Sequence, residues 1–267
     1  MPEAIETPSI PSALGDVVKR QLFAVQDYSL LSIQSIGNIF TAPRYANDML
    51  EQMDLIGVGS LPIVVISSLF IGGVLVLNTA SQFERFGETA LTGDAVALAL
   101  VRELGPTITA LLVAGRNASG MASELGSMIV TEQVDAMRAL GTDPIRKLMT
   151  PRVIATALML PLLVAAADFL GLVGGFVVAH MTLHLSSAQF WRRAIDALAF
   201  GDLVMGMMKP LAFGLIIATV GCWQGLRVKG GTQGVGRATT NAVVISSVFV
   251  LTVDFFLTRL FLFLFNL

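Results

Sequence analysis

Formal charges interrupt several long apolar stretches of this 267-residue sequence. Arg102 and Glu103 stand side by side in one stretch, and Asp168 and Asp254 stand in two others. A charge at the centre of a bilayer costs at least ~2.5–3.5 kcal/mol on insertion scales, so such residues are candidates for binding or transport. Adjacent residues on a helix point about 100° apart. We therefore expect Arg102 and Glu103 to reach different partners, or a polar cavity.

The surroundings of these charges leave alternatives open. Arg102 can form an ion pair between helices with Asp168 or Asp254, in which case its role is structural. Lys209 precedes Pro210, and we interpret it as a lysine that extends toward the membrane surface at the outer end of its span. A second alternative is a proton relay through Glu103, Asp168 and Asp254, as in a secondary transporter.

Two motifs that would indicate catalysis are incomplete. The stretch "GGTQGVGRAT" has the glycine spacing of a phosphate-binding loop but gives Arg237-Ala238 where Lys and Ser or Thr are required. ATP and Mg²⁺ are therefore expected on a separate chain, with no cofactor and no enzyme activity in this one. His180 and His184 share a helix face, but no third ligand is evident, so no metal site is predicted.

A polar segment lies between two apolar stretches, in "GSMIVTEQVDAMRALGTDP". The spacing of its apolar residues predicts a short amphipathic helix over residues 128–141, which Gly141 and Pro144 would end. An interfacial helix that binds anionic lipid should be rich in Lys and Arg, whereas this polar face is mixed, which favours docking to a soluble protein. The apolar stripe comprises Val130, Val134, Met137 and Leu140.

The elements that carry these residues are predicted to be membrane helices. Hydrophobic residues make up 54% of the chain and charged residues 13%, about half the charged fraction of soluble domains. Because ~20 apolar residues span a bilayer as a helix, we predict an all-α polytopic membrane protein. Its five spans are expected at about 55–83, 94–115, 153–183, 203–226 and 238–265.

The remaining N-terminal part, residues 1–53, is predicted to be a tail and an interfacial amphipathic helix, with a short soluble cap helix as the alternative. Residues 54–267 would form the transmembrane domain. The acidic, proline-containing start lacks a basic signal region. With the N-terminus inside, 11 of 17 basic residues fall in cytoplasmic segments and three outside, so we expect a cytoplasmic N-terminus and a periplasmic C-terminus. A net charge of −2 does not favour nucleic acid.

One long segment resembles the permease subunit of MlaE/YrbE-type ABC transporters, which serve MCE-linked lipid trafficking. It is "RELGPTITALLVAGRNASGMASELGSMIVTEQVDAMRALGTDPIRKLMTPRVIA", residues 102–155, and a looser likeness covers about 15–265. The matching pieces, in order, are Arg102 to Pro106, Ala114 to Arg116, Glu124 to Gly126, Thr131 to Gln133, Ala136, Gly141, Asp143-Pro144 and Pro151-Arg152.

The resemblance implies a homodimer that encloses a central lipid cavity and is flanked by two cytoplasmic ATPases (MlaF-like). It further implies a periplasmic MCE ring protein (MlaD-like), a possible STAS-domain subunit (MlaB-like) and phospholipid as the substrate, in a bacterial inner membrane. Such a transporter maintains outer-membrane lipid asymmetry or moves lipid between membranes. The residues that the resemblance assigns to lipid binding are Leu75, Val76, Leu77, Arg102 and Glu103. The residues that it assigns to the ATPase-coupling helix are Thr131, Glu132, Gln133, Asp135 and Arg138.

Overall fold

The computed structural model describes residues 10–38 and 45–265, without the side chains of residues 10–18, 20, 21 and 90. The first nine residues of the predicted tail and Arg44, one of the basic residues assigned to the cytoplasmic side, lie outside this part. All regular elements in the described ranges are helical. In chain order they are α1 (Ile10–Asn38), α2 (Ala46–Met53), η1 (Asp54–Val58), α3 (Gly59–Glu84), η2 (Thr89–Leu91), α4 (Thr92–Ala99), η3 (Leu100–Leu104), α5 (Gly105–Val113), η4 (Ala114–Ala118), α6 (Ser119–Val130), α7 (Gln133–Ala139), η5 (Ile145–Met149), α8 (Thr150–Leu183), α9 (Ser187–Asp196), α10 (Phe200–Leu226) and α11 (Gly231–Phe265).

Five helical runs in the described ranges are long and apolar enough to cross a membrane, which confirms the predicted number and the all-α class. They are Ala46–Glu84, Thr92–Val130, Ile145–Leu183, Phe200–Leu226 and Gly231–Phe265. Several begin earlier or end later than predicted. The first run passes without a break through the predicted boundary at residues 53 and 54, because α2 continues through the π-helical turn η1 into α3.

The second span shows why the predicted ends were too short. We expected it to end at Gly115, before Arg116 and Glu124, but the helix continues to Val130. Neighbouring elements satisfy both charges. The Arg116 guanidinium donates to the Leu55 carbonyl at 3.1 Å and to Ser60 Oγ at 2.9 Å, and Glu124 accepts from Arg152 at 2.9 Å. A charged side chain with such partners does not end a helix.

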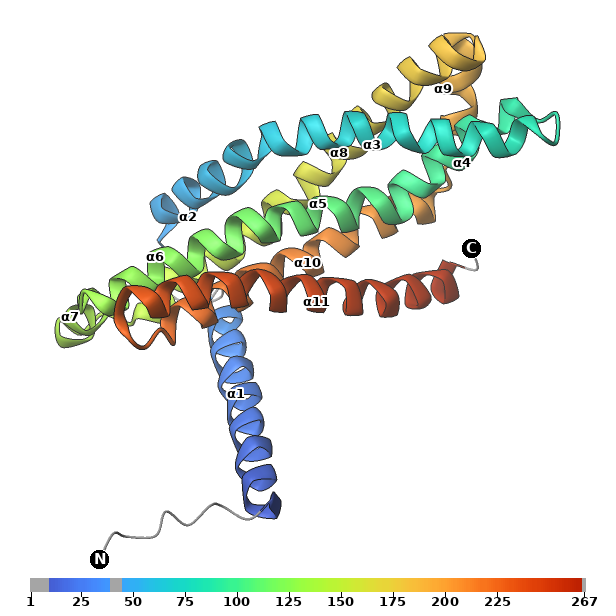
Figure 1. The fold of residues 1–267 in the computed structure, drawn as a ribbon. Helices are drawn as coiled ribbons and strands as arrows, with labels where there is room; N and C mark the ends of the chain where they lie inside the picture. The colour runs from blue at the N-terminus through green and yellow to red at the C-terminus, as the bar shows by residue number, and fades with distance from the viewer. Residues whose placement is uncertain (1–9, 39–44, 266–267) are drawn as a thin grey trace, which may run out of the picture.

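The spans run side by side, so that their connections gather at the two ends of the bundle (Figure 1). One end carries α7 and the turn between α10 and α11. The other carries α9 and the start of α4. This alternation agrees with the division of loops that the distribution of basic residues predicted.

Glycines bring the spans into backbone contact. A Cβ atom added to Gly72 of α3 would lie 1.8 Å from the Gly171 carbonyl oxygen of α8. On the other side of the bundle, one added to Gly221 of α10 would lie 3.0 Å from the Ala118 Cα of η4. Glycine at such contacts allows close helix approach. The pairs Gly171/Gly175 and Gly221/Gly225, which the sequence left open between bundle and dimer packing, thus pack within this chain.

The first helix runs crosswise to the bundle and meets it only near its C-terminal half (Figure 1). Tyr28 Oη lies 2.9 Å from Thr219 Oγ1, and its ring stands edge-on to Trp223 at 5.5 Å. Asp27 pairs with Arg227 at 3.3 Å. Elsewhere on this helix large apolar side chains are exposed, among them Leu22, Phe23, Val25, Leu30 and Ile33.

Candidate functional site

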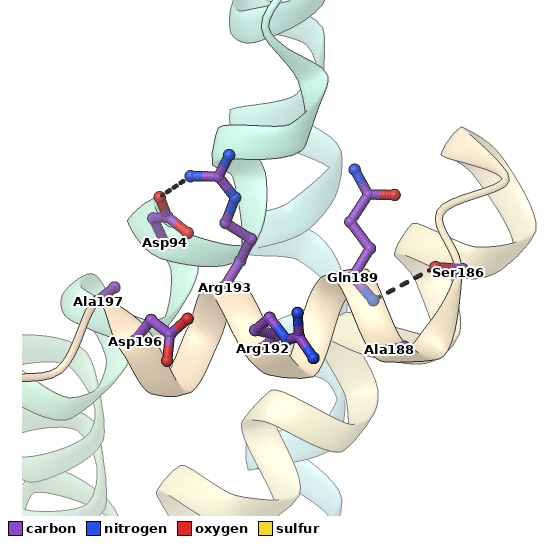
Figure 2. Close-up of a pocket in the computed structure, with 8 residues that line it drawn as sticks. All are labelled: Asp94, Ser186, Ala188, Gln189, Arg192, Arg193, Asp196 and Ala197. Carbon is purple, nitrogen blue, oxygen red and sulfur yellow. Dashed lines mark hydrogen bonds and ion pairs between the residues drawn. The ribbon is translucent and has the colours of Figure 1, made fainter.

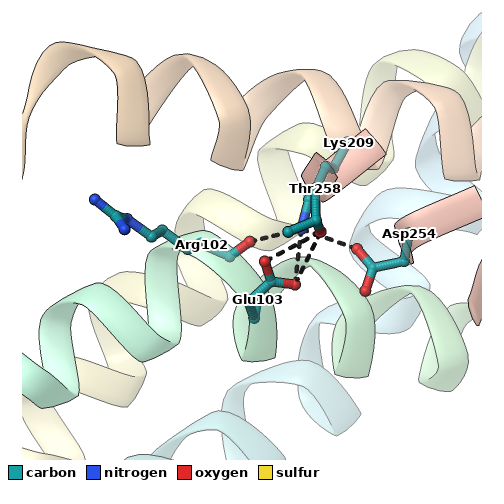
Figure 3. Close-up of polar contacts among 5 residues, drawn as sticks. All are labelled: Arg102, Glu103, Lys209, Asp254 and Thr258. Atoms are coloured by element: carbon teal, nitrogen blue, oxygen red, sulfur yellow. Dashed lines mark hydrogen bonds and ion pairs between the residues drawn. The ribbon is translucent and has the colours of Figure 1, made fainter. Parts of the chain in front are cut away.

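A lysine buried between three spans organises the charges inside the bundle. Lys209 of α10 has no exposed side-chain surface, and its Nζ lies 2.8 Å from Glu103 Oε2 and 2.9 Å from Asp254 Oδ1 of α11 (Figure 3). Its Nζ also donates to the Arg102 carbonyl oxygen at 2.9 Å. The interpretation of Lys209 as a lysine extending toward the membrane surface is therefore wrong, because two hydrogen bonds and an ion pair with Asp254 hold its ammonium group inside the protein.

Local sequence explains why the Arg102 carbonyl is free to accept this bond. Pro106 has no N–H, so it cannot donate to the carbonyl four residues earlier, which is that of Arg102. The same segment forms the π-helical turn η3, in which the Gly105 N–H bonds to the carbonyl of Leu100. Such turns occur frequently at functional sites. The Arg-Glu-Leu-Gly-Pro stretch thus supplies both a carboxylate and a backbone acceptor to one lysine.

Arg102 points away from this cluster (Figure 3). Its Nε lies 2.6 Å from Oδ1 of Asp202, which is fully buried at the start of α10. The other carboxylate oxygen of Asp202 accepts from the Ala199 N–H at 2.9 Å. Arg102 and Glu103 therefore reach different partners, as their spacing predicted. The alternative ion pair of Arg102 with Asp168 or Asp254 is wrong, because Asp202 is its partner.

The buried cluster opens onto a pocket of about 400 Å³ beside α11. Glu103 is 39% exposed and accepts from Thr258 Oγ1 at 3.1 Å, whereas Asp254 is 16% exposed. Arg259 adds a cation to the wall. Asp254 and Arg259 thus line one pocket, while Asp254 also pairs with Lys209 of the neighbouring span. The pocket combines two carboxylates and an arginine with apolar side chains, namely Leu251, Phe255 and Leu262.

The three apolar candidates of the first span lie in different environments. Val76 is fully buried, in a core cluster with Val96 and Leu100, so its side chain has no surface open to a lipid chain in this structure. Leu75 packs against that cluster and is partly buried. Leu77 is 50% exposed, so it is the one of the three whose side chain is open to a lipid chain in this structure.

The predicted helix over residues 128–141 is broken in the structure. Helix α6 continues to Val130, a turn occupies Thr131 and Glu132, and α7 then covers Gln133–Ala139. Glu132 has a left-handed backbone (φ 59°), which interrupts the helix. The preceding β-branched residues favour a helix less than straight side chains do. Gly141, with φ 76°, ends the segment as expected.

The five predicted coupling residues lie exposed on this turn and on α7. Asp135 and Arg138 form an ion pair at 2.9 Å, and Gln133 Nε2 donates to Thr131 Oγ1 at 3.0 Å. Val134 anchors the segment, because its side chain is fully buried, but Leu140 of the predicted apolar stripe is 84% exposed. The polar tip therefore presents both charges and an apolar side chain.

A second polar pocket, of about 610 Å³, lies at the opposite end of the bundle (Figure 2). Arg193 of α9 reaches Asp94 of α4 at 3.4 Å, and Ser186 caps α9 by accepting from the Gln189 N–H at 3.3 Å. Arg192 and Arg193 are two of the three basic residues predicted to lie outside, and the sequence did not indicate this pocket. No motif distinguishes it, because its residues are brought together by the packing of α9 on α4.

Comparison with known proteins gives the chain its class and its family. The sequence is 38% identical over 253 residues to a "Probable ABC transporter permease protein" of Rickettsia felis, which covers 95% of this chain and 98% of the relative. A protein of the same description from Synechocystis is 41% identical over 211 residues, 79% of this chain and 80% of its own. The chloroplastic protein TRIGALACTOSYLDIACYLGLYCEROL 1 of Arabidopsis thaliana is 37% identical over 232 residues, 87% of this chain and 66% of its own.

Five apolar spans and these relatives define an integral membrane permease subunit of an ABC transporter. The profile described as "Permease MlaE" matches residues 49–260. The chain therefore belongs to the MlaE permease family. The resemblance drawn from residues 102–155 is confirmed.

Proposed function

We propose that this chain is the membrane subunit of an ATP-driven phospholipid transporter, which works as a homodimer in the bacterial inner membrane. The observation that carries this proposal is the pocket beside α11, where charged groups stand next to apolar ones. A phospholipid needs both kinds of surface. Arg259 offers a partner for its phosphate, Glu103 offers an acceptor for an amine, and Leu251 and Phe255 offer contacts for the acyl chains.

The same pocket supports a second copy of the chain as a partner. Helix α11 is the least buried of the five spans and exposes a row of large apolar side chains. Lipid alone can cover such a row, but the ionisable residues Asp254 and Arg259 on the same helix favour a protein-lined interior. The exposed row includes Val244, Val248, Leu251, Phe255 and Phe256.

Helix α7 supports coupling to a separate ATPase. Its exposed charges and Leu140 lie at the end of the bundle opposite α9 (Figure 1). With the N-terminus in the cytoplasm, this end faces the cytosol, and α9 faces a periplasmic MCE ring protein. ATP-driven closure of two ATPases would then push α7 and, through α6, the spans.

Purification from native membranes tests this assignment. We expect an ATPase to co-purify with the wild-type chain and to be lost when Glu132 and Asp135 are both replaced by lysine. The fold should persist, because the Asp135–Arg138 pair is exposed and contributes at most about 1 kcal/mol. Asp196→Lys, which reverses a charge on α9, is the matched control and should retain the ATPase.

Transport assays then test the substrate. Purified complex in liposomes should move phospholipid between leaflets or to an acceptor only with hydrolysable ATP. Transport that persists without an ATPase would instead support the proton-driven alternative. Retention of the ATPase by the doubly substituted chain would show that α7 is not the docking site.

A further inference from the structure

Asp168 is an acidic residue in the middle of α8 that takes no part in the Lys209 charge cluster. Its Oδ1 atom is buried and has no hydrogen-bond partner among residues 10–38 and 45–265. A Cβ added to Gly105 would lie 1.7 Å from this oxygen and 2.9 Å from the carbonyl oxygen of Leu100. The carboxyl group therefore rests directly on the π-helical turn η3, in the space that glycine leaves.

The charged groups around Asp168 already have other partners. Helix α8 packs against α3, α4, α5, η3 and α10, among other elements. The one charged residue of α4 is Asp94, an acid that pairs with Arg193. No Lys, Arg, Asp or Glu occurs in α5 or in α3 before Glu84. On η3 and α10 the charged groups are Arg102, paired with Asp202, and Glu103, paired with Lys209. Among the described residues of α3, α5, η3 and α10, no cation is thus left to neutralise a carboxylate at Asp168.

The chemistry of this contact favours the neutral acid. A carboxylate has acceptor atoms only. The Leu100 carbonyl oxygen, which borders the same space over Gly105, is also an acceptor, so a carboxylate there has nothing to accept from it. A protonated carboxyl group has an O–H to donate. The Leu100 oxygen accepts one bond from the Gly105 N–H and keeps a second lone pair. An unpaired charge in such surroundings is expensive, and ionisable groups respond by becoming neutral.

We propose that Asp168 is an intramembrane proton-binding site, whose carboxylic O–H donates to the backbone carbonyl of Leu100 and fastens α8 to η3. Glu103 and Asp254 have their own partner, Lys209, and belong to the charge cluster rather than to this site. The site therefore differs from the proton relay considered for the sequence. It holds a proton in place next to the turn that carries Arg102 and Glu103, and it does not depend on the proposed lipid substrate.

Infrared spectroscopy of the full-length chain in lipid nanodiscs tests this directly. At neutral pH the wild-type protein should show the C=O stretching band of a protonated carboxylic acid, shifted in D₂O, and Asp168→Asn should lose it. Asp196→Asn, which removes an exposed acid from α9, is the matched control and should keep the band. A wild-type spectrum without this band, or a band that survives in Asp168→Asn, would overturn the proposal.

The response to pH and salt separates a proton from a metal cation. If a proton occupies the site, the thermal unfolding temperature of the wild type should fall as the pH is raised into the alkaline range, and that of Asp168→Asn should fall less. A sodium ion held by the Asp168 and Leu100 oxygens would instead make the wild type more stable with added Na⁺ and leave the variant unchanged. That result would refute the proton assignment.

A chemical test remains if Asp168→Asn does not assemble. Dicyclohexylcarbodiimide modifies protonated carboxyl groups in apolar surroundings, so the wild-type peptide that contains Asp168 should gain an adduct at neutral pH. Alkaline pH should decrease the yield. An unmodified peptide, or a yield that does not depend on pH, would count against a stored proton.

Discussion

Replacing Lys209 by methionine tests whether the buried cluster holds the three helices together. Methionine keeps an unbranched apolar stem of similar length but removes the ammonium group. Glu103 and Asp254 would then face each other without the cation that lies within 2.9 Å of both. Removal of one partner from a buried ion pair destabilises proteins by about 3–5 kcal/mol, because the remaining charge is left unpaired.

The exposure of the two acids sets the expected loss near the lower end of this range. The side chain of Glu103 is 39% exposed and that of Asp254 is 16% exposed, so both regain some solvation when Lys209 is removed. A loss of about 3 kcal/mol corresponds to a decrease of roughly 6–12 °C in the unfolding temperature of a chain of this size. Thermal unfolding in detergent, followed by the monodisperse fraction, measures it.

A neutral triple variant provides the control. Lys209→Met combined with Glu103→Gln and Asp254→Asn leaves no unpaired charge and should recover most of the lost stability, since buried ion pairs replaced as a set are often neutral in effect. Phospholipid transport should fail in both variants if the charges act on substrate. An unfolding temperature of Lys209→Met equal to that of the wild type, or a triple variant less stable than the single one, would refute the reasoning.

Two further predictions follow from contacts elsewhere in the bundle. Gly72→Ala should destabilise the fold by about 1–3 kcal/mol, because its Cβ would overlap the Gly171 carbonyl. Gly120→Ala has nothing within 4 Å of the added Cβ and should stabilise the fold by about 0.5–1 kcal/mol. Chemical or thermal unfolding compares the two variants. Lys147→Asp breaks the ion pair between η5 and Asp48 of α2, so it should decrease lipid transport while ATP hydrolysis persists. The double variant Lys147→Asp/Asp48→Lys, which exchanges the two charges, should restore transport in the same liposome assay. A swap no better than the single variant would exclude that link.

Hydrophobic runs were enough to predict the five spans, because a bilayer imposes the same length on each. The ends of the spans depend on tertiary partners that the sequence does not display. Arg116 was predicted to lie beyond the second span, yet Leu55 and Ser60 of the first span accept its hydrogen bonds. The break at Glu132 was missed for a related reason. The apolar residues of segment 128–141 are spaced as in one continuous helix, and only the left-handed backbone of Glu132 divides that segment into two helices.

The candidate site was predictable as a set of charges but not as a set of pairs. The sequence located Arg102, Glu103 and Asp254 in apolar surroundings, and their presence there required compensation. It did not identify Lys209 as the shared partner, because more than 100 residues separate Lys209 from Glu103 along the chain. A balance of charges counted over all spans could have found it, since two acids in the membrane require a cation at the same depth.

Pro106 connects these observations. Without an N–H at this position, the Arg102 carbonyl lacks its usual donor within the helix, and the Lys209 ammonium takes that place. The same ammonium pairs with Glu103 of the turn and with Asp254 of α11. The missing N–H in the second span is therefore matched by a lysine of the fourth span, which in turn pairs with an acid of the fifth. Movement of α11 relative to α10 must either break this contact or carry η3 with it. While this contact holds, the pocket beside α11 changes shape together with the turn that bears Arg102.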